Sequence, residues 1–189
     1  MYNIRVFYER GNTALKIAIV YTTTGGTTKE CANLLARQLE RHSVTVADME
    51  EGTELSGFDM IVVGFPIRMG KAARRARKFF IDNADILKKS SVGYFICCGF
   101  VDCFEDYREK VIPRALAESA FEIACFGGSL EPSRFRGLDR FAVKAVRSEI
   151  LGGGENGESR ADMSLPTIMD ENIAQFADRM KKMSEKFAW

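Results

Sequence analysis

Histidine and long apolar runs are nearly absent from this 189-residue chain. The single histidine, His42, leaves no cluster that could bind zinc or non-haem iron, and it argues against a histidine-based catalytic triad. No stretch approaches the roughly 20 apolar residues that a membrane-spanning helix needs. Arg5, Glu9 and Arg10 stand where the core of a secretory signal would be apolar. We therefore expect a cytoplasmic protein without a metal site.

The chain also lacks a marked net charge. Its formal net charge is +1, so any attraction to an anionic partner must come from local clusters of basic residues. No nucleic-acid partner is expected, because no recognition motif is present. The five cysteines contain no CxxC pair and are odd in number, which favours reduced thiols over a disulfide framework. Their spacing also offers no ligand set for an iron–sulfur cluster.

Apolar runs alternate with amphipathic segments along the chain. Residues 15–21 are continuously apolar and β-branched, as in a parallel strand that is buried on both faces. Further strands are expected at 44–47, 59–64, 92–97 and 121–127, and helices at 28–42, 71–82, 104–119 and 170–186. This alternation predicts an α/β fold: a doubly wound parallel sheet of five strands in the order 2-1-3-4-5, with helices on both faces.

One domain accounts for nearly the whole chain, since 189 residues fit the usual size of a single domain. Residues 1–14 show no clear period and are expected to form an N-terminal extension. Residues 15–189 are expected to form the domain. Within it, residues 129–160 carry several arginines and form a basic insertion before the last helix.

Hydroxyl groups and glycines dominate the loop between the first strand and the first helix. At a helix N-terminus, free N–H groups and the helix dipole favour an anion, and the glycines let the backbone approach it closely. The loop lacks the lysine and spacing of an NTP-binding P-loop, and the chain has no GxGxxG fingerprint. We therefore predict a monophosphate site, with an ordinary N-cap and turn as the alternative. Its residues would be Thr22, Thr23, Thr24, Gly25, Gly26, Thr27 and Thr28.

Two more loops are expected beside this one. Doubly wound sheets bind ligands at the carboxyl ends of strands near the point where the strand order reverses. The cofactor contacts predicted in these loops are Pro66, Ile67, Arg68, Met69, Gly70, Cys98, Gly99 and Phe100. Phe65 and Phe100 are candidates for packing against a bound ring, and ordinary packing is the alternative. The neighbouring cysteines are better explained as buried thiols than as catalytic ones.

The loop sequence TTGGTT at 23–28 resembles the flavodoxin family, whose phosphate loop reads roughly (S/T)-x-T-G-x-T after the first strand. Gly25 departs from the pattern, because flavodoxins usually have another hydroxyl at that position. The resemblance implies a flavodoxin-like fold that holds FMN non-covalently. The tryptophan and tyrosine that stack on the flavin in short electron-transfer flavodoxins are not evident here.

Two later segments resemble one subgroup, the menaquinone-dependent protoporphyrinogen IX dehydrogenases of bacteria. The sequence IRMG at 67–70 is similar to the S-I-R-Y-G pattern of the subgroup, and PSRFRGLDRF at 132–141 is similar to its Y-P-R-Y-R-x-x-D-R-F pattern. The resemblance implies an FMN-dependent oxidoreductase of haem biosynthesis that passes electrons from protoporphyrinogen through FMN to a quinone. A flavodoxin-type electron carrier between protein partners and a cofactor-free interaction scaffold remain the alternatives. No catalytic side chain is identified.

Basic residues gather on the helix expected at 71–82 and in the insertion. Positions i, i+3, i+4 and i+7 of that helix share one face. The expected substrate or membrane contacts are Arg68, Lys71, Arg74, Arg75, Lys78, Arg134, Arg136 and Arg140. They would bind porphyrinogen carboxylates or the anionic headgroups at the inner face of a membrane, where the protein would be peripheral. A solvated helix face is the plain alternative.

Overall fold

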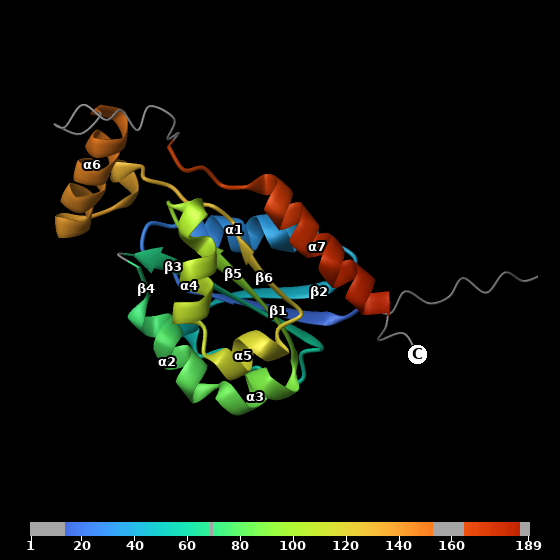
Figure 1. Ribbon diagram of the computed structural model, residues 1–189. Helices are drawn as coiled ribbons and strands as arrows, with labels where there is room; N and C mark the ends of the chain where they lie inside the picture. Colours follow the sequence, from blue (N-terminus) through green and yellow to red (C-terminus); the bar gives the residue numbers. More distant parts are fainter. Residues whose placement is uncertain (1–13, 69, 153–164, 186–189) are drawn as a thin grey trace, which may run out of the picture.

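Strands and helices alternate along the chain in this computed structural model, which describes residues 14–68, 70–152 and 165–185 (Figure 1). The strands are β1 (Lys16–Tyr21), β2 (Ser43–Asp48), β3 (Met60–Arg68), β4 (Lys71–Ala72), β5 (Ser91–Cys97) and β6 (Glu122–Cys125). The α-helices are α1 (Thr27–Arg37), α2 (Arg74–Asp82), α3 (Ala84–Lys89), α4 (Phe104–Val111), α5 (Arg114–Ser119), α6 (Gly137–Gly152) and α7 (Asp170–Ser184). Short 3-10 helices are η1 (Met49–Glu51), η2 (Val101–Cys103) and η3 (Pro132–Arg134). Residues 1–13 of the expected extension, Met69 and residues 153–160 of the insertion lie outside the described residues.

The five long strands pair in parallel in the order β2-β1-β3-β5-β6. This confirms the predicted order. The described part of the chain adds a sixth strand, the two-residue β4, which pairs antiparallel with the end of β3. The strand order reverses between β1 and β3, so the loops that follow these two strands diverge around a crevice at their carboxyl ends.

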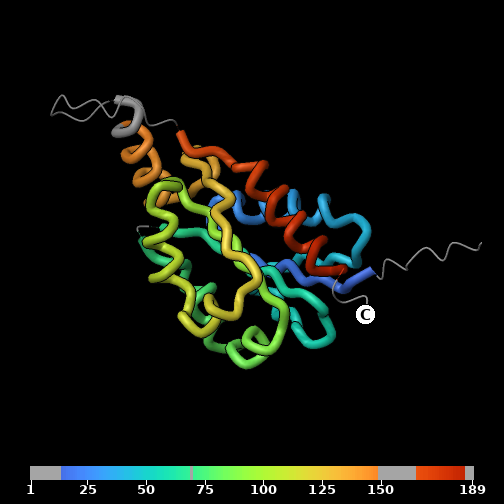
Figure 2. Tube along the Cα trace, turned by 45° about the vertical axis from the view of Figure 1, so that its right-hand side comes forward, coloured from blue at the N-terminus to red at the C-terminus, as the bar shows by residue number. Residues whose placement is uncertain are grey.

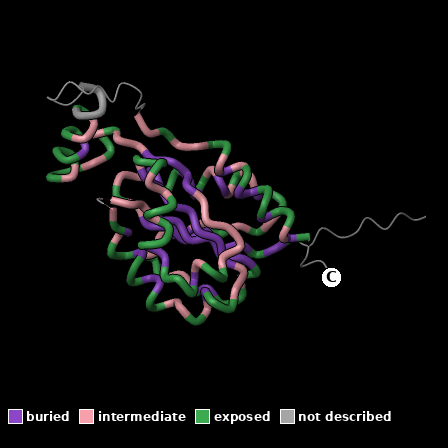
Figure 3. The backbone as a smooth tube through the Cα atoms, in the orientation of Figure 1, coloured by how far each residue is buried: buried purple, intermediate pink, exposed green. Residues whose placement is uncertain are grey.

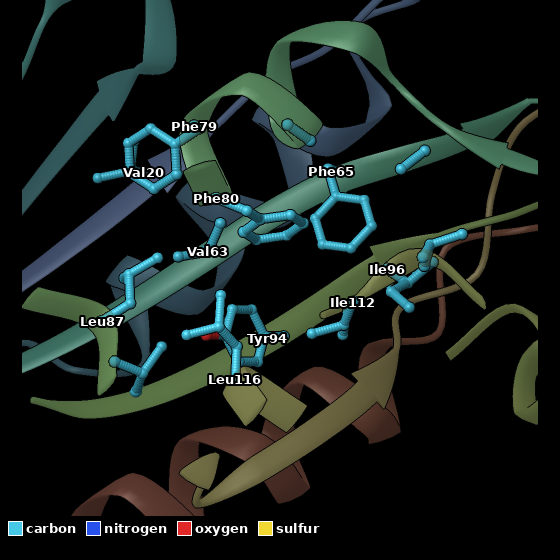
Figure 4. Packing of buried hydrophobic residues seen from close by; sticks show 14 of the residues in the cluster. Val20, Val63, Phe65, Phe79, Phe80, Leu87, Tyr94, Ile96, Ile112 and Leu116 are labelled. Carbon is cyan, nitrogen blue, oxygen red and sulfur yellow. The ribbon is translucent and has the colours of Figure 1, made fainter. Parts of the chain in front are cut away.

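Two apolar layers cover the sheet. Helices α1 and α7 pack on one face, while α2, α3, α4 and α5 cover the other, as Figures 1 and 2 show. On the second face, the rings of Phe65, Phe80 and Tyr94 meet edge to face, with Phe65 and Phe80 centroids 5.4 Å apart (Figure 4). Phe65 is fully buried in this layer. Its side chain points into the core, which agrees with ordinary packing and not with contact to a bound ring.

Two predicted helices begin or end differently in the structure. Gly70 has a positive φ of 71° and reverses the chain, so that Lys71 pairs with Arg68 in a hairpin instead of starting a helix. Helix α2 begins at Arg74, and Lys71 does not share its basic face. The single helix expected at 104–119 is two helices, because the extended residue Ile112 precedes Pro113 and separates α4 from α5.

The insertion lies apart from the sheet. Helix α6 and η3 extend beside the carboxyl ends of β3 and β5 and make few contacts with the layers (Figures 1 and 2). Among the α6 side chains that are described, residues 137–148, only Val143 is buried, and Figure 3 shows this segment as largely exposed. None of the described helices is long and apolar enough to cross a membrane.

Candidate functional site

The loop after β1 forms a tight turn into helix α1. The Thr22 N–H donates to the Gly64 carbonyl, which aligns the ends of β1 and β3. The Gly26 N–H donates to Thr23 Oγ1 at 2.9 Å and closes the turn. Gly26 is the N-cap of α1 with φ 84°, a left-handed conformation that favours glycine. The turn therefore leaves the N–H groups of the first helical turn without intrahelical partners, which is the arrangement that the predicted anion site requires.

Thr28 supplies an unsatisfied polar group beside these amides. Its side chain is buried, and its Oγ1 atom has no hydrogen-bond partner of good geometry within the described residues. The contact with Cys31 and burial raise the pKa of the neighbouring Cys97 thiol well above its usual value, and the Thr28 hydroxyl opposes this rise only in part. A buried hydroxyl without a strong partner is costly, and a ligand oxygen would satisfy it.

A cavity of about 210 Å³ lies at this edge of the sheet. Three loops predicted to bind a cofactor meet around it, and the insertion covers it. The predicted residues that line it are Thr23, Thr24, Gly25, Thr27, Thr28, Pro66, Ile67, Arg68, Gly70, Cys98, Gly99 and Phe100. Thr22 and Gly26 shape the first loop without lining the cavity, and Met69 lies outside the described residues.

Several residues of the cavity wall do not figure among those predicted from the sequence. They come from the loop after β6, from α4 and from the insertion: Tyr107, Gly128, Ser129, Leu130, Phe135, Ala142, Val143 and Val146. Phe135 belongs to the PSRFRGLDRF segment, which could have suggested a role at the site. Tyr107 and Val143 carry no comparable signal, since an aromatic or aliphatic residue on a helix usually indicates core packing.

Phe135 packs directly on the predicted phosphate loop. A Cβ atom added at Gly25 would lie only 2.7 Å from the Phe135 ring. The sequence TTGG therefore leaves room for this ring where a hydroxyl-bearing residue would collide with it. This contact gives a physical reason for the departure at Gly25 from the usual flavodoxin pattern.

Ion pairs join the insertion to the loops of the site. Arg68 donates to both carboxylate oxygens of Asp139, with N–O distances of 2.8 and 2.5 Å. This hydrogen bonding raises the pKa of Arg68 and lowers the pKa of Asp139. The Phe135 ring lies 5.9 Å from the Arg68 guanidinium carbon. Arg134 of the insertion pairs with Glu30 of α1 at 2.7 Å.

The other predicted basic contacts do not line the cavity. Arg74, Arg75 and Lys78 are exposed on α2, and Lys71 is exposed on β4. Arg75 pairs with Glu50 of η1, and Lys78 pairs with Asp82 of its own helix. Both ion pairs partly neutralise the positive charge on the exposed face of α2. Arg134, Arg136 and Arg140 also lie outside the cavity lining, on the insertion.

Two thiols meet behind the cavity. Cys98 and Cys125 are buried with their sulfur atoms 3.5 Å apart, and the Gly127 N–H donates to the Cys125 sulfur. These hydrogen bonds, led by the one from Cys98, lower the pKa of Cys125 to about 7 despite its burial. The same contact raises the pKa of Cys98. The contact between the two sulfur atoms thus shifts the two pKa values in opposite directions.

The fold and a match to a family model define the class of protein. The family model described as "Flavodoxin domain" matches residues 18–156, and the chain belongs to this family and has its FMN-binding fold. A short-chain flavodoxin associated with a bacterial microcompartment superposes with a TM-score of 0.51 at 16% identity, covering 90% of this chain and 99% of the other. This likeness supports the fold.

Among curated proteins, the chain is similar to the protoporphyrinogen IX dehydrogenase (quinone) of Escherichia coli strain K12. The two are 25% identical over 186 residues, which cover 91% of this chain and 98% of the relative. The proteins of the same name from E. coli strains O6:H1 and O157:H7 match with the same identity and coverage.

The residues of the cavity fit an FMN phosphate. The phosphate carries several strong hydrogen-bond acceptors, and the loop offers helix N-terminal amides and the buried Thr28 hydroxyl, which lacks a strong partner. Gly26 turns the chain in a left-handed conformation, and a side chain at Gly25 would collide with the Phe135 ring. Residues 22–28 include no cationic side chain, so backbone amides and hydroxyls would have to bind the phosphate.

Proposed function

We propose that this protein is an FMN-dependent oxidoreductase that oxidises a carboxylate-bearing porphyrinogen and passes the electrons to a quinone. The observation that carries the proposal is the match to protoporphyrinogen IX dehydrogenase, which extends over 98% of that protein and so includes the region of the insertion. A carrier flavodoxin would not need a helix that covers its cofactor cavity.

Different loops of the protein would bind different parts of the cofactor. The loop Thr23–Thr28 would hold the phosphate, and the loops 66–70 and 98–100 would border the flavin ring. Bound FMN supplies the redox chemistry, which accepts electrons from the substrate and gives them up again. The chain itself would bind, orient and exclude water; Phe100, Tyr107 and Leu130 give the cavity apolar walls for this purpose.

Arg68 stands at the rim of the cavity and is the best placed of the predicted basic residues to bind a substrate carboxylate. Arg74 and the exposed face of α2, together with Arg140 beside the exposed side chains of Leu138 and Phe141, would serve docking on a quinone-bearing membrane. The apolar side chains and the positive charge would then act together at the membrane surface.

Anaerobic mixing of the FMN-loaded protein with protoporphyrinogen IX tests the proposal. We expect the flavin absorbance to bleach and porphyrin fluorescence to rise, followed by repeated turnover when a menaquinone analogue is added. A flavin that dithionite reduces but that is inert towards porphyrinogen would contradict the proposed substrate and favour an electron carrier between protein partners.

A second comparison tests the membrane contact. Binding to vesicles that contain phosphatidylglycerol is compared for the wild type and for Leu138→Ser with Phe141→Ser. We expect the double variant to bind more weakly while it keeps its FMN content. Equal vesicle binding would contradict a contact through this face.

A further inference from the structure

The Arg68–Asp139 pair joins two parts of the molecule that are far apart in sequence. Arg68 ends β3 at the rim of the cavity, and Asp139 lies in the first turn of α6. Both oxygens of Asp139 accept from the guanidinium, so that the carboxylate occupies the planar fork that arginine offers to a carboxylate ligand. Asp139 thus shows where and how a carboxylate binds at this rim.

Another carboxylate could also replace Asp139 in this ion pair. The side chains of Arg68 and Asp139 are 35% and 41% exposed, so water and solutes reach both partners. Ion pairs of this exposure contribute only about 0–1 kcal/mol to stability. A carboxylate from solution that replaced Asp139 would restore the same two hydrogen bonds to Arg68, and the released Asp139 would be hydrated. The exchange therefore carries little intrinsic cost.

The Arg68–Asp139 pair ties the insertion to the rim of the cavity. Phe135, Val143 and Val146 of the insertion form part of the cavity wall, and Phe135 fills the space beside Gly25. The cavity volume of about 210 Å³ is below the roughly 300–1,000 Å³ that is typical of ligand sites. A flavin nucleotide and a substrate need more room, which an outward shift of Phe135 and α6 would provide.

We propose that Arg68 is the carboxylate-recognition residue of the site and that the carboxylate of Asp139 occupies the ligand's position on Arg68 when no ligand is bound. A carboxylate-bearing ligand displaces Asp139 from Arg68 and thereby releases α6 and Phe135 from the cavity. Asp139 is a positioning residue in this account, and it selects for ligands whose carboxylate can compete with it. The inference rests on the proposed function for the identity of the substrate, but not for the exchange itself.

The displacement of Asp139 by another carboxylate can be tested without any flavin or porphyrinogen. The measurement is amide hydrogen exchange of α6 in the flavin-free protein. The exchange rates of residues 137–147 are compared for the wild type, Asp139→Asn and Asp82→Asn. The last variant is a matched control, because it makes the same chemical change in the exposed Lys78–Asp82 pair of α2. We expect about fivefold faster exchange in Asp139→Asn, in keeping with the free energy of an exposed ion pair, and no change in Asp82→Asn.

The carboxylate probe is propane-1,2,3-tricarboxylate, compared with chloride at the same ionic strength. We expect the tricarboxylate to speed α6 exchange in the wild type and in Asp139→Glu, which keeps the carboxylate, and to have no further effect on Asp139→Asn. Equal α6 rates in Asp139→Asn and Asp82→Asn would overturn the proposal. So would a tricarboxylate effect that persists in Asp139→Asn or is absent from the wild type.

The outcomes separate this inference from the proposed function. If α6 responds as expected while the FMN-loaded protein is inert towards porphyrinogen, Arg68 recognises a carboxylate of another substrate. If porphyrinogen is oxidised while α6 exchange is unaffected by Asp139→Asn, the pair is a surface contact only and the inference is wrong.

Discussion

The sheet and the insertion are stabilised by different means. The five long strands are covered on both faces by apolar layers, and residues such as Ile19 and Phe95 have no solvent exposure. The insertion has one buried side chain among residues 137–148 and is joined to the site by exposed ion pairs and by Phe135. Apolar burial therefore fixes the floor of the cavity, whereas exchangeable polar contacts hold its cover. The difference agrees with the proposal that the loop at 23–28 stays in place while the insertion moves.

The largest expected effect contrasts two phenylalanines from these regions. Phe80 is buried between Phe65 and Tyr94, whereas Phe141 on α6 is 71% exposed. We expect Phe80→Ala to lower the free energy of unfolding by about 3–5 kcal/mol through lost burial and a cavity, and Phe141→Ala to change it by less than about 0.5 kcal/mol. Urea denaturation measures both. Similar losses would show that the insertion is part of the core.

The buried hydroxyl of Thr28 is expected to have opposite effects on binding and on stability. In Thr28→Val, FMN affinity should fall by about tenfold, because a hydrogen bond to the phosphate is lost. The stability of the flavin-free protein should stay the same or rise, since a buried hydroxyl without a strong partner is removed. Thr45→Val on the exposed side of β2 is the control and should alter neither quantity. Unchanged FMN affinity in Thr28→Val would place the phosphate elsewhere.

The Arg68–Asp139 pair should affect the position of α6 more than the global stability of the protein. We expect Asp139→Asn to lower the free energy of unfolding by less than about 1 kcal/mol, because both partners are partly exposed. Thermal and urea denaturation of the flavin-free protein check this value. A loss of several kcal/mol would mean that α6 is integral to the folding unit, and the contrast between the two regions would fail.

The two thiol pairs offer the smallest and most local test. Cys125 is buried, so its modification by iodoacetamide should be slow, but the rate should rise as the pH passes through about 7, where its thiolate forms. Cys97, which also lies against a second sulfur, should stay unmodified at neutral pH because its pKa is raised. Peptide mass spectrometry distinguishes the two sites. Equal reactivity of both cysteines across this range would contradict the lowered pKa of Cys125.

Much of the fold could be predicted because its signals are local. The apolar run 15–21, the alternation of strands and helices, and the Gly-rich loop after the first strand each depend on adjacent residues. The order of the sheet follows from the connections that such units allow. The hairpin at 68–71 could not be predicted in this way, because it depends on the left-handed conformation of Gly70.

The candidate site also has a part that local sequence signals predict and a part that they do not. Its floor comes from loops at the ends of strands, whose place is set by the sheet. Its cover depends on contacts across long sequence separations, such as Arg68 with Asp139 and Gly25 with Phe135, which no local pattern reveals. The i, i+3, i+4, i+7 spacing predicted one helix face for Lys71, Arg74, Arg75 and Lys78, but Lys71 precedes α2. The spacing also did not reveal that acidic neighbours pair with two of them.

Titration of the flavin-free protein with FMN and with riboflavin tests the central claim most directly. The two ligands share the ring system and differ in the phosphate, so the ratio of their dissociation constants reports the phosphate loop alone. The account predicts one FMN per chain and an affinity for FMN at least about a hundredfold higher than for riboflavin, since several charge-assisted hydrogen bonds at a helix N-terminus are involved. Equal affinities, or no binding of FMN, would contradict a phosphate site at Thr23–Thr28.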